Sequence, residues 1–236
     1  MDATTDKRAA LAATAAWRPM AFGDRPPARI ENPLYEPLWP GRRVLVDVGP
    51  QGVTIRDADL GERPGVAELR AAIAAANLAV EVVLDGYLVP APLEPTHGAP
   101  PGGGSTAGIT ARAMLRQFLI GGLGQSSARE AVRRISAREV PLPPGAPIGF
   151  VAVDLLWLDG EPLLEVPLGE RKRLLEAVVA DGELVRRTVP VRPPVERSYA
   201  GWHALGFREI AVKAANSHYT PGGRCDDWTI TPIPFR

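Results

Sequence analysis

Apolar and polar positions alternate in two ways along this chain, and each way predicts a different element. Residues 43–48 alternate from one residue to the next, turn residues follow at 49–52, and a second short run occupies 53–56, which is the pattern of a β-hairpin. Short apolar runs bounded by turn residues predict further strands. These runs lie at 80–84, 87–89, 150–158, 184–189, 209–214 and 228–231.

Apolar residues at helical spacing predict amphipathic helices. Val66, Leu69 and Ile73 follow Pro64, a favourable residue for the first helical turn, and would share one face. A second amphipathic helix is predicted from Leu168 to Ala180. Further helices are predicted at 5–16, at 110–119 and after Ser126 and Ser127. Because strands and helices mix without a regular βαβ rhythm, the sequence predicts an α+β fold with mainly antiparallel sheets.

Composition divides the chain into a lead and one main domain. Residues 1–30 predict an N-terminal helix or lead, residues 31–236 the main domain, and the proline- and glycine-rich stretch 90–108 a loop within it. No apolar run reaches the length of a membrane span, and the first residues lack the apolar stretch of a signal peptide. The expected location is therefore cytoplasmic, with no membrane partner. Cys225 is the single cysteine, so no internal disulfide is expected.

Charge and metal-ligating residues argue against some functions. Lysine and arginine together number 27, aspartate and glutamate also number 27, and the formal net charge is zero. Tight non-specific DNA binding usually comes with a basic surplus, because neutralised phosphates release counterions. The histidines and Cys225 have no metal-site spacing. A local DNA contact stays open on one predicted helix face, for which the alternative is an ordinary solvated surface. The arginines of that face are Arg129, Arg133, Arg134 and Arg138.

Several motifs follow one another in a recognisable order. They are Glu36–Arg43 (EPLWPGRR), Val82–Val89 (VVLDGYLV), Phe150–Gly160 (FVAVDLLWLDG), Pro167–Leu175 (PLGERKRLL), Gly206–Lys213 (GFREIAVK) and Tyr219–Trp228 (YTPGGRCDDW). In this order they resemble the motifs of the nucleotidyltransferase (adenylation) domain of ATP-dependent DNA ligases. The resemblance implies two mainly antiparallel sheets with flanking helices around a nucleotide cleft. In the family an oligonucleotide-binding (OB) barrel follows this domain. Because the chain ends five residues after Thr231, no C-terminal OB barrel is expected in it.

The resemblance also indicates which reacting groups are missing. In the family a lysine attacks the α-phosphate of ATP, and Leu38 stands at that position without an amine. The chain departs from the family at further positions where the family has a charged residue. These are Pro40 for an aspartate, Tyr87 and Arg208 for glutamates, and Ile230 and Pro232 for lysines. We therefore expect no catalytic residue and no metal site, in a domain that resembles a ligase degenerate at its catalytic positions.

Some positions that contact the nucleotide in the family keep their residue type. The resemblance implies that Glu36 helps to recognise adenine, that Arg43 lies near the ribose and phosphate, and that Lys213 contacts the α-phosphate. Asp85 and Arg208 complete the candidate nucleotide-binding set, because the Arg208 guanidinium could bind a phosphate in place of a metal. The candidate cofactors are ATP or AMP, bound without Mg²⁺.

The same residues have structural alternatives. Arg43 could form an ion pair with Glu36 or Asp85, and Lys213 could be a surface lysine. Two aromatic residues could fill the cleft as part of the core instead of stacking on a ligand. They are Trp39 and Tyr87.

The leading hypothesis is a DNA ligase-like nucleotidyltransferase domain that is catalytically inactive. It would act as a nucleotide- or nucleic-acid-binding module, or as a regulatory module, linked to DNA repair. Its candidate partners are a nucleotide, DNA ends or a DNA-repair protein. Two alternatives stay open: a divergent but active ATP-dependent DNA ligase or nucleotidyl transferase, and a structural assembly subunit that uses the fold only as a surface.

Overall fold

The computed structural model describes residues 14–57, 60, 63–91, 93 and 147–234. Within these residues the helices are α2 (Val66–Ala76), α5 (Leu168–Val178) and α6 (Glu196–Ala204), with 3-10 turns at Thr14–Ala16 and Pro27–Arg29. The strands are β1 (Ala21–Phe22), β2 (Pro33–Pro37), β3 (Arg42–Gly49), β4 (Gly52–Ile55), β5 (Val82–Pro90), β6 (Ile148–Leu158), β7 (Glu161–Pro162), β8 (Val185–Arg187), β9 (Glu209–Ala214), β10 (Arg224–Cys225) and β11 (Trp228–Pro232).

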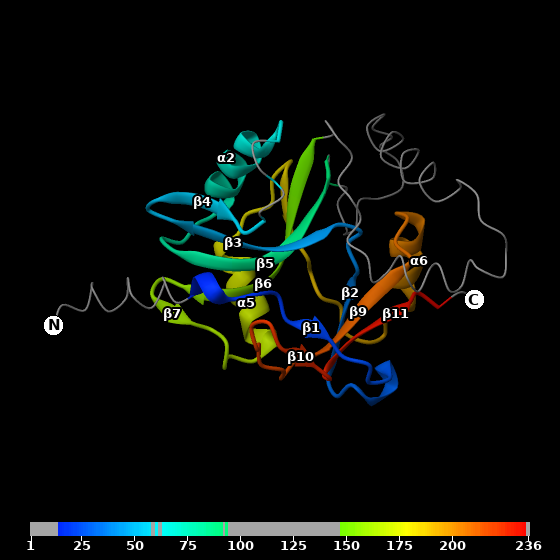
Figure 1. Ribbon diagram of the computed structural model, residues 1–236. Coiled ribbons are helices and arrows are strands. Elements are labelled where there is room, and N and C mark those ends of the chain that lie inside the picture. The colour runs from blue at the N-terminus through cyan, green and yellow to red at the C-terminus, as the bar shows by residue number, and fades with distance from the viewer. Residues whose placement is uncertain (1–13, 58–59, 61–62, 92, 94–146, 235–236) are drawn as a thin grey trace.

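These strands form a large sheet, a small sheet and one short pair (Figure 1). The large sheet has the order β4-β3-β5-β6-β7, in which every pair is antiparallel, and β8 joins β6 in parallel. The small sheet has the antiparallel order β11-β9-β2, and β1 pairs in parallel with β10. The predicted α+β class with mainly antiparallel sheets is therefore confirmed.

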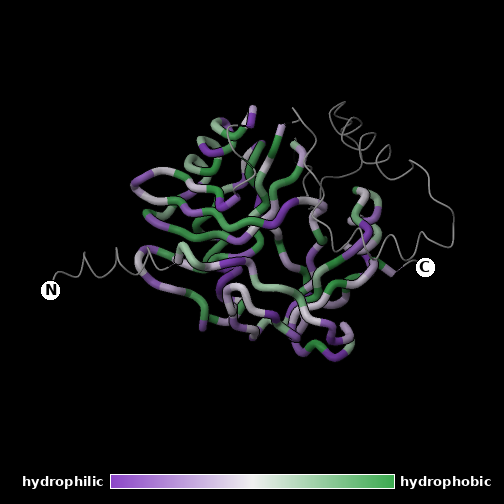
Figure 2. The backbone as a smooth tube through the Cα atoms, in the orientation of Figure 1, coloured by the Kyte–Doolittle hydropathy of each residue, from purple (hydrophilic) through white to green (hydrophobic). Residues whose placement is uncertain are grey.

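Helices α2 and α5 pack against the large sheet. Val66, Leu69 and Ile73 of α2 and Leu175 of α5 are buried in one core cluster with apolar residues of β3, β5 and β6. Val83 of β5 belongs to another cluster, which includes residues of the small sheet. Figure 2 shows apolar positions concentrated along the central strands and hydrophilic positions in the outer loops. The hydrophobic effect thus holds the helices and the two sheets together through separate core clusters.

Strand β5 runs without interruption through Asp85 and Gly86, where the sequence analysis placed a break. The carboxylate of Asp85 is bound by Arg43 and Tyr219, so its charge does not end the strand. A Cβ atom on Gly86 would lie 2.4 Å from the Phe150 ring on the neighbouring strand. Glycine at this position therefore allows β6 to pack closely against β5, and it does not mark a turn.

The predicted hairpin and both amphipathic helices are confirmed. Strands β3 and β4 pair with Gly49 opposite Gly52, whose φ of +101° suits glycine at the turn. Helix α6 and strand β2 are not predicted by the sequence. Helix α6 has Trp202 as its one buried residue, so it shows no apolar periodicity. Prolines occupy both ends of β2, and proline is unfavourable within a strand.

The segment before residue 31 is partly described. Met20 and Ile30 are buried, and β1 pairs with β10, so residues 14–30 pack onto the main domain. The predicted helices at 110–119 and after Ser126, the arginine face that follows, and most of the 90–108 loop lie outside the described residues. In the described part of the chain, no helix is long and apolar enough to cross a membrane.

Candidate functional site

Leu38, which the motifs predict to stand at the nucleophile position, lies in apolar surroundings directly after β2. Its backbone N–H donates to the carbonyl of Glu209 at 3.0 Å, and its side chain packs against a core cluster that contains Trp39 and Tyr87. The Trp39 indole donates to the Thr188 hydroxyl at 2.9 Å and meets the Phe207 ring edge-to-face at 5.0 Å. Tyr87 and Trp39 are each 8% exposed. Their alternative interpretation as core aromatics is confirmed.

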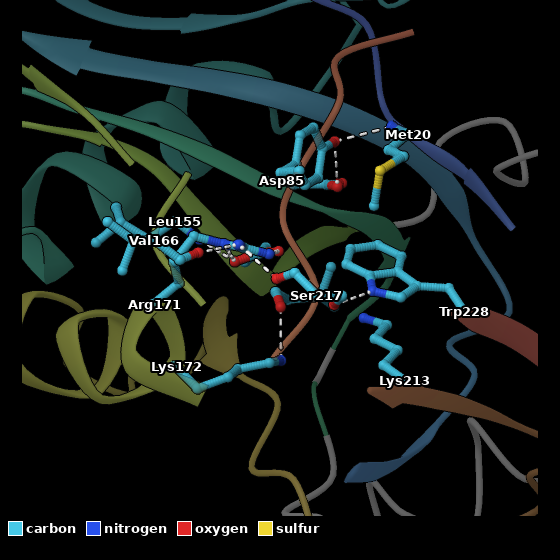
Figure 3. Close-up of polar contacts among 12 residues, drawn as sticks. Met20, Asp85, Leu155, Val166, Arg171, Lys172, Lys213, Ser217 and Trp228 are labelled. Carbon is cyan, nitrogen blue, oxygen red and sulfur yellow. Dashed lines mark hydrogen bonds and ion pairs between the residues drawn. The ribbon is translucent and has the colours of Figure 1, made fainter. Parts of the chain in front are cut away.

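Glu36 is the centre of a buried group of charges contributed by three elements. The pairing of β2 with β9 places Leu34 opposite Lys213, and the period of two puts Glu36 on the same face. Lys213 Nζ donates to Glu36 Oε2 at 2.9 Å, and Lys172 Nζ on α5 forms an ion pair with Glu36 Oε1. Lys172, labelled in Figure 3, also donates to the Val153 carbonyl at 2.6 Å. Both carboxylate oxygens of Glu36 are therefore occupied by lysines of the same chain.

Lys213 has a second set of contacts, to aromatic rings. Its Nζ lies 4.5 Å from the centre of the Trp228 ring and 5.9 Å from that of Phe22. A cation over an aromatic face is favourable, above all where water is excluded. Because Lys213 is only 2% exposed, its alternative interpretation as a surface lysine is wrong.

Burial and charge act against each other in this group. Burial by itself would raise the pKa of Glu36, but the charges and hydrogen bonds of Lys172 and Lys213 outweigh it and lower that pKa. The pKa of Lys172 is lowered, because burial and the nearby Lys213 charge exceed the effect of Glu36. Two ammonium groups share one carboxylate, so the group carries a surplus positive charge when all three are ionised.

Asp85 is held by Arg43 and Tyr219. Arg43 Nε and Nη2 donate to the two Asp85 oxygens at 2.9 and 2.5 Å, and the Tyr219 hydroxyl donates to Oδ2 at 2.7 Å. Met20 closes this arrangement, because its N–H donates to the Tyr219 oxygen at 2.9 Å and its carbonyl accepts from Arg43 at 2.6 Å. Burial would lower the pKa of Arg43, but the charge and hydrogen bonds of Asp85, together with Tyr87 and Tyr219, outweigh burial and raise that pKa. The alternative of an Arg43–Asp85 ion pair is confirmed.

A second bidentate pair joins β6 to α5. Arg171 Nε and Nη2 donate to the two oxygens of Asp154 at 2.9 and 2.8 Å, and both side chains are fully buried. Arg171 also donates to the carbonyls of Val166 and Ser217, and Ser217 Oγ accepts from the Trp228 indole at 2.7 Å (Figure 3). Bidentate pairing with further hydrogen bonds is the geometry that offsets the desolvation of buried charges.

We refer to these seven residues, of which six are buried and Arg43 is partly exposed, as the charge network: Glu36, Arg43, Asp85, Asp154, Arg171, Lys172 and Lys213. Four of the five candidate nucleotide-binding residues belong to it. The sequence does not indicate the roles of Arg171 and Lys172, because both lie in a run of charged residues at the start of a helix, a pattern typical of a solvated face. The chain therefore brings most of the predicted site together, but with its side chains paired to one another.

Arg208 lies apart from the charge network at the surface. Its Nη1 is 2.8 Å from Nε2 of His203, and its side chain is exposed. The other predicted contact set, the arginine face of Arg129, Arg133, Arg134 and Arg138, lies outside the described residues. Within the residues that the structure describes, no three histidine, cysteine, aspartate or glutamate side chains are grouped so that they could hold a metal ion.

The fold agrees with that of solved DNA ligase structures. The structure of a mycobacterial DNA ligase D complexed with ATP and MES matches with a TM-score of 0.55 and 23% identity, over 90% of this chain and 58% of that one. The ligase domain of M. tuberculosis LigD matches with a TM-score of 0.53 and 22% identity, over 90% of this chain and 58% of that one. The chain has the nucleotidyltransferase fold of DNA ligases. The fold class implied by the motifs is thereby confirmed.

Sequence relatives support the same assignment. The multifunctional non-homologous end joining protein LigD of Mycolicibacterium smegmatis is 27% identical over 196 residues, which are 82% of this chain and 20% of that protein. A DNA ligase of Methanothrix thermoacetophila is 36% identical over 90 residues, or 37% of this chain and 16% of that ligase. The chain thus spans a fifth or less of these relatives' length. No protein-family model matches it. The predicted resemblance to ATP-dependent DNA ligases is confirmed.

Proposed function

We propose that this chain is a catalytically inactive DNA ligase-like nucleotidyltransferase domain that acts as a binding or regulatory module in DNA repair. The observation that carries this proposal is Leu38, which stands at the nucleophile position and packs against apolar core residues. Adenylation needs an amine whose lone pair attacks the α-phosphate, forms a P–N bond and releases pyrophosphate. An isobutyl group has no lone pair for this step. The link to repair comes from the relatives, one of which is named an end-joining protein.

The state of Glu36 supports the same proposal. In the family its counterpart helps to recognise adenine, but here Lys172 and Lys213 occupy both carboxylate oxygens. An adenine amino group could reach Glu36 only if a lysine moved away from it, and the ammonium group of that lysine would then be buried without a counter-ion. Tyr87 and Arg208 also remove two family carboxylates, and Mg²⁺ requires oxygen ligands. Neither the purine contact nor the metal of the ligase reaction is therefore favoured.

Weak nucleotide binding without Mg²⁺ is the finer part of the proposal. Arg43 and Lys213 are the cations that would meet a phosphate, and each is held by a buried carboxylate at 2.9 Å. A phosphate would have to compete with those carboxylates, so we expect a Kd no tighter than roughly tens of micromolar, or about 6 kcal/mol. The module would then bind nucleotide as a weak ligand and not as a substrate.

The test is self-adenylation. The purified chain is incubated with α-labelled ATP and Mg²⁺ or Mn²⁺, denatured, and examined for covalent label, with an active ATP-dependent DNA ligase treated in parallel. We expect no label on this chain and none on Leu38→Lys, because Ile230 and Pro232 still stand at the family's phosphate-binding lysines. Acid-labile label on the wild-type chain would overturn the proposal and favour a divergent enzyme, whose nucleophile peptide mapping would then identify.

A further inference from the structure

Two large apolar side chains, those of Leu78 and Val80, are exposed on the loop between α2 and β5. Leu78 is 67% exposed and Val80 is 69% exposed, and among the described residues Leu205, at 39%, is the other large apolar residue with high exposure. Single exposed apolar residues are ordinary, whereas a contiguous group often marks an interaction surface. The question is therefore whether Leu78 and Val80 are part of such a group.

The ends of α2 and α5 meet at this loop and extend the apolar surface. The N–H of Leu78 donates to the Val178 carbonyl at 2.8 Å, and the N–H of Ala180 donates to the Ala76 carbonyl at 2.8 Å. Apart from Glu176 in the last turn of α5, the exposed residues of both helix ends and of the loop are apolar. We call them the apolar patch: Ala74, Ala75, Leu78, Val80, Ala177 and Ala180.

The loop that presents the patch is held in place by hydrogen bonds. The carboxylate of Asp159 accepts from the N–H groups of Val80 and Glu81 at 2.9 and 2.8 Å. The Asn77 side-chain amide donates to the Ala79 carbonyl at 2.7 Å. Because the backbone is fixed at several points, a partner would not have to order it on binding, which lowers the entropic cost of association.

Carboxylates border the patch. Glu176 precedes Ala177, Asp181 follows Ala180, and Glu81 and Asp159 lie beside Val80. Arg187 contacts Glu176 at 3.1 Å and Asp181 at 3.8 Å. Arg70 lies one turn before Ala74 on α2, and the exposed Arg173 lies one turn before Ala177 on α5. The four carboxylates thus outnumber the three arginines, so the rim has a small excess of negative charge.

We propose that the apolar patch is a docking surface for a partner-protein segment whose apolar side chains are flanked by lysine or arginine. The negative charge of the rim favours this partner over a second copy of the chain, a lipid surface or a nucleic acid. A second copy related by two-fold symmetry would bring acidic rim against acidic rim, which is repulsive. An anionic lipid surface or a nucleic-acid backbone would be repelled in the same way. A basic, apolar segment covers Leu78 and Val80 and neutralises the rim.

The experiment uses a fluorescent 14-residue peptide with leucines at helical spacing and lysines on both sides of that face. Its binding to the full chain is measured by anisotropy at several salt concentrations. We expect Leu78→Ser together with Val80→Ser to weaken binding about 10-fold or more, because two largely exposed apolar side chains lose their burial. Glu176→Gln should weaken binding about 2- to 5-fold and flatten its salt dependence. Leu205→Ser is the matched control and should leave binding unchanged.

Three outcomes would overturn the proposal. One is equal binding by wild-type and by the Leu78→Ser, Val80→Ser chain. Another is equal binding of a peptide in which glutamates replace the lysines. The last is a wild-type dimer in sedimentation equilibrium that the double substitution dissociates, which would make a second copy the occupant. Both altered side chains are exposed, so unchanged circular dichroism and unfolding midpoints are expected and show that any loss of binding is local.

Discussion

Replacing Glu36 by glutamine separates a structural role of this residue from a role in ligand recognition. The substitution keeps the shape of the side chain and removes the negative charge between Lys172 and Lys213. The glutamine oxygen can accept from one lysine, while its amide NH₂ group, itself a donor, faces the other. The two ammonium groups are then buried without a counter-ion.

The magnitude follows from the burial of all three groups. Breaking a buried ion pair by removing one partner typically costs about 3–5 kcal/mol, because the remaining charge is left uncompensated. The side chains of Glu36, Lys172 and Lys213 are 2%, 5% and 2% exposed, so little solvent screening reduces this cost. We expect Glu36→Gln to lower the free energy of unfolding by about 3–5 kcal/mol, a large share of the 5–15 kcal/mol of an ordinary domain.

A double-mutant cycle shows the origin of this loss. Lys172→Met removes the surplus cation but leaves the Val153 carbonyl without its donor, which alone costs about 1–3 kcal/mol. In the Glu36→Gln background the same change also removes the charge repulsion. The two losses should therefore be non-additive, with a coupling of about 1–3 kcal/mol. The matched control is Glu170→Gln, which breaks an exposed pair with Arg173 and should cost no more than about 0.5 kcal/mol.

The assay is urea unfolding followed by circular dichroism, repeated from neutral to acid pH. The pKa of Glu36 is lower in the folded chain than its ordinary 4.5, so its contribution is present above about pH 4.5 and is lost as the pH falls through the folded value. The difference in stability between wild type and Glu36→Gln should therefore shrink in acid. A loss below about 1 kcal/mol at neutral pH, or a gain, would refute the structural role and favour a residue kept for a ligand.

Three further predictions concern the tyrosine in the core, the nucleotide and DNA. Burial raises the pKa of Tyr87 from 10.0 to about 12, so folding favours the neutral phenol, and this contribution to stability is lost as the pH rises from 10 to 12. The wild-type chain should therefore lose roughly 2 kcal/mol of unfolding free energy over that range that Tyr87→Phe does not lose, measured as a smaller fall in the melting temperature of the variant. Calorimetry with ATP or AMP should give the same weak binding with and without excess chelator, and binding that disappears with chelator would indicate a metal site. DNA binding, measured by anisotropy, should be weak and fall steeply with salt, and Arg133→Ala with Arg134→Ala should weaken it equally for all sequences; no binding at low salt would leave these arginines as ordinary surface.

The fold could be predicted from the sequence further than the site could. Leu-Asp-Gly and the other motifs lie at core strands and turns, where local pattern and tertiary structure agree, so they indicate the fold directly. Lys172 could not be placed in the same way. Its neighbours in sequence are charged residues of a helix start, and its burial depends on Glu36, which lies 136 positions earlier and reaches α5 only through the packing of β2. Helical periodicity contains no information about such a long-range contact.

The charge network also gives a physical reason why a chain of this fold could lack the ligase nucleophile, as we propose, and still carry residues that the motifs assign to the nucleotide site. Leu38 and Tyr87 are uncharged and pack among apolar neighbours, so the charged residues of the family can be absent there without leaving a partner unpaired. Arg43, Asp85 and Lys213 differ, because each is one half of a buried ion pair. Removing either half leaves a charge in the core and costs several kcal/mol, whether or not a nucleotide ever binds. Their presence is therefore accounted for by folding alone, and it does not indicate that the adenylation chemistry persists.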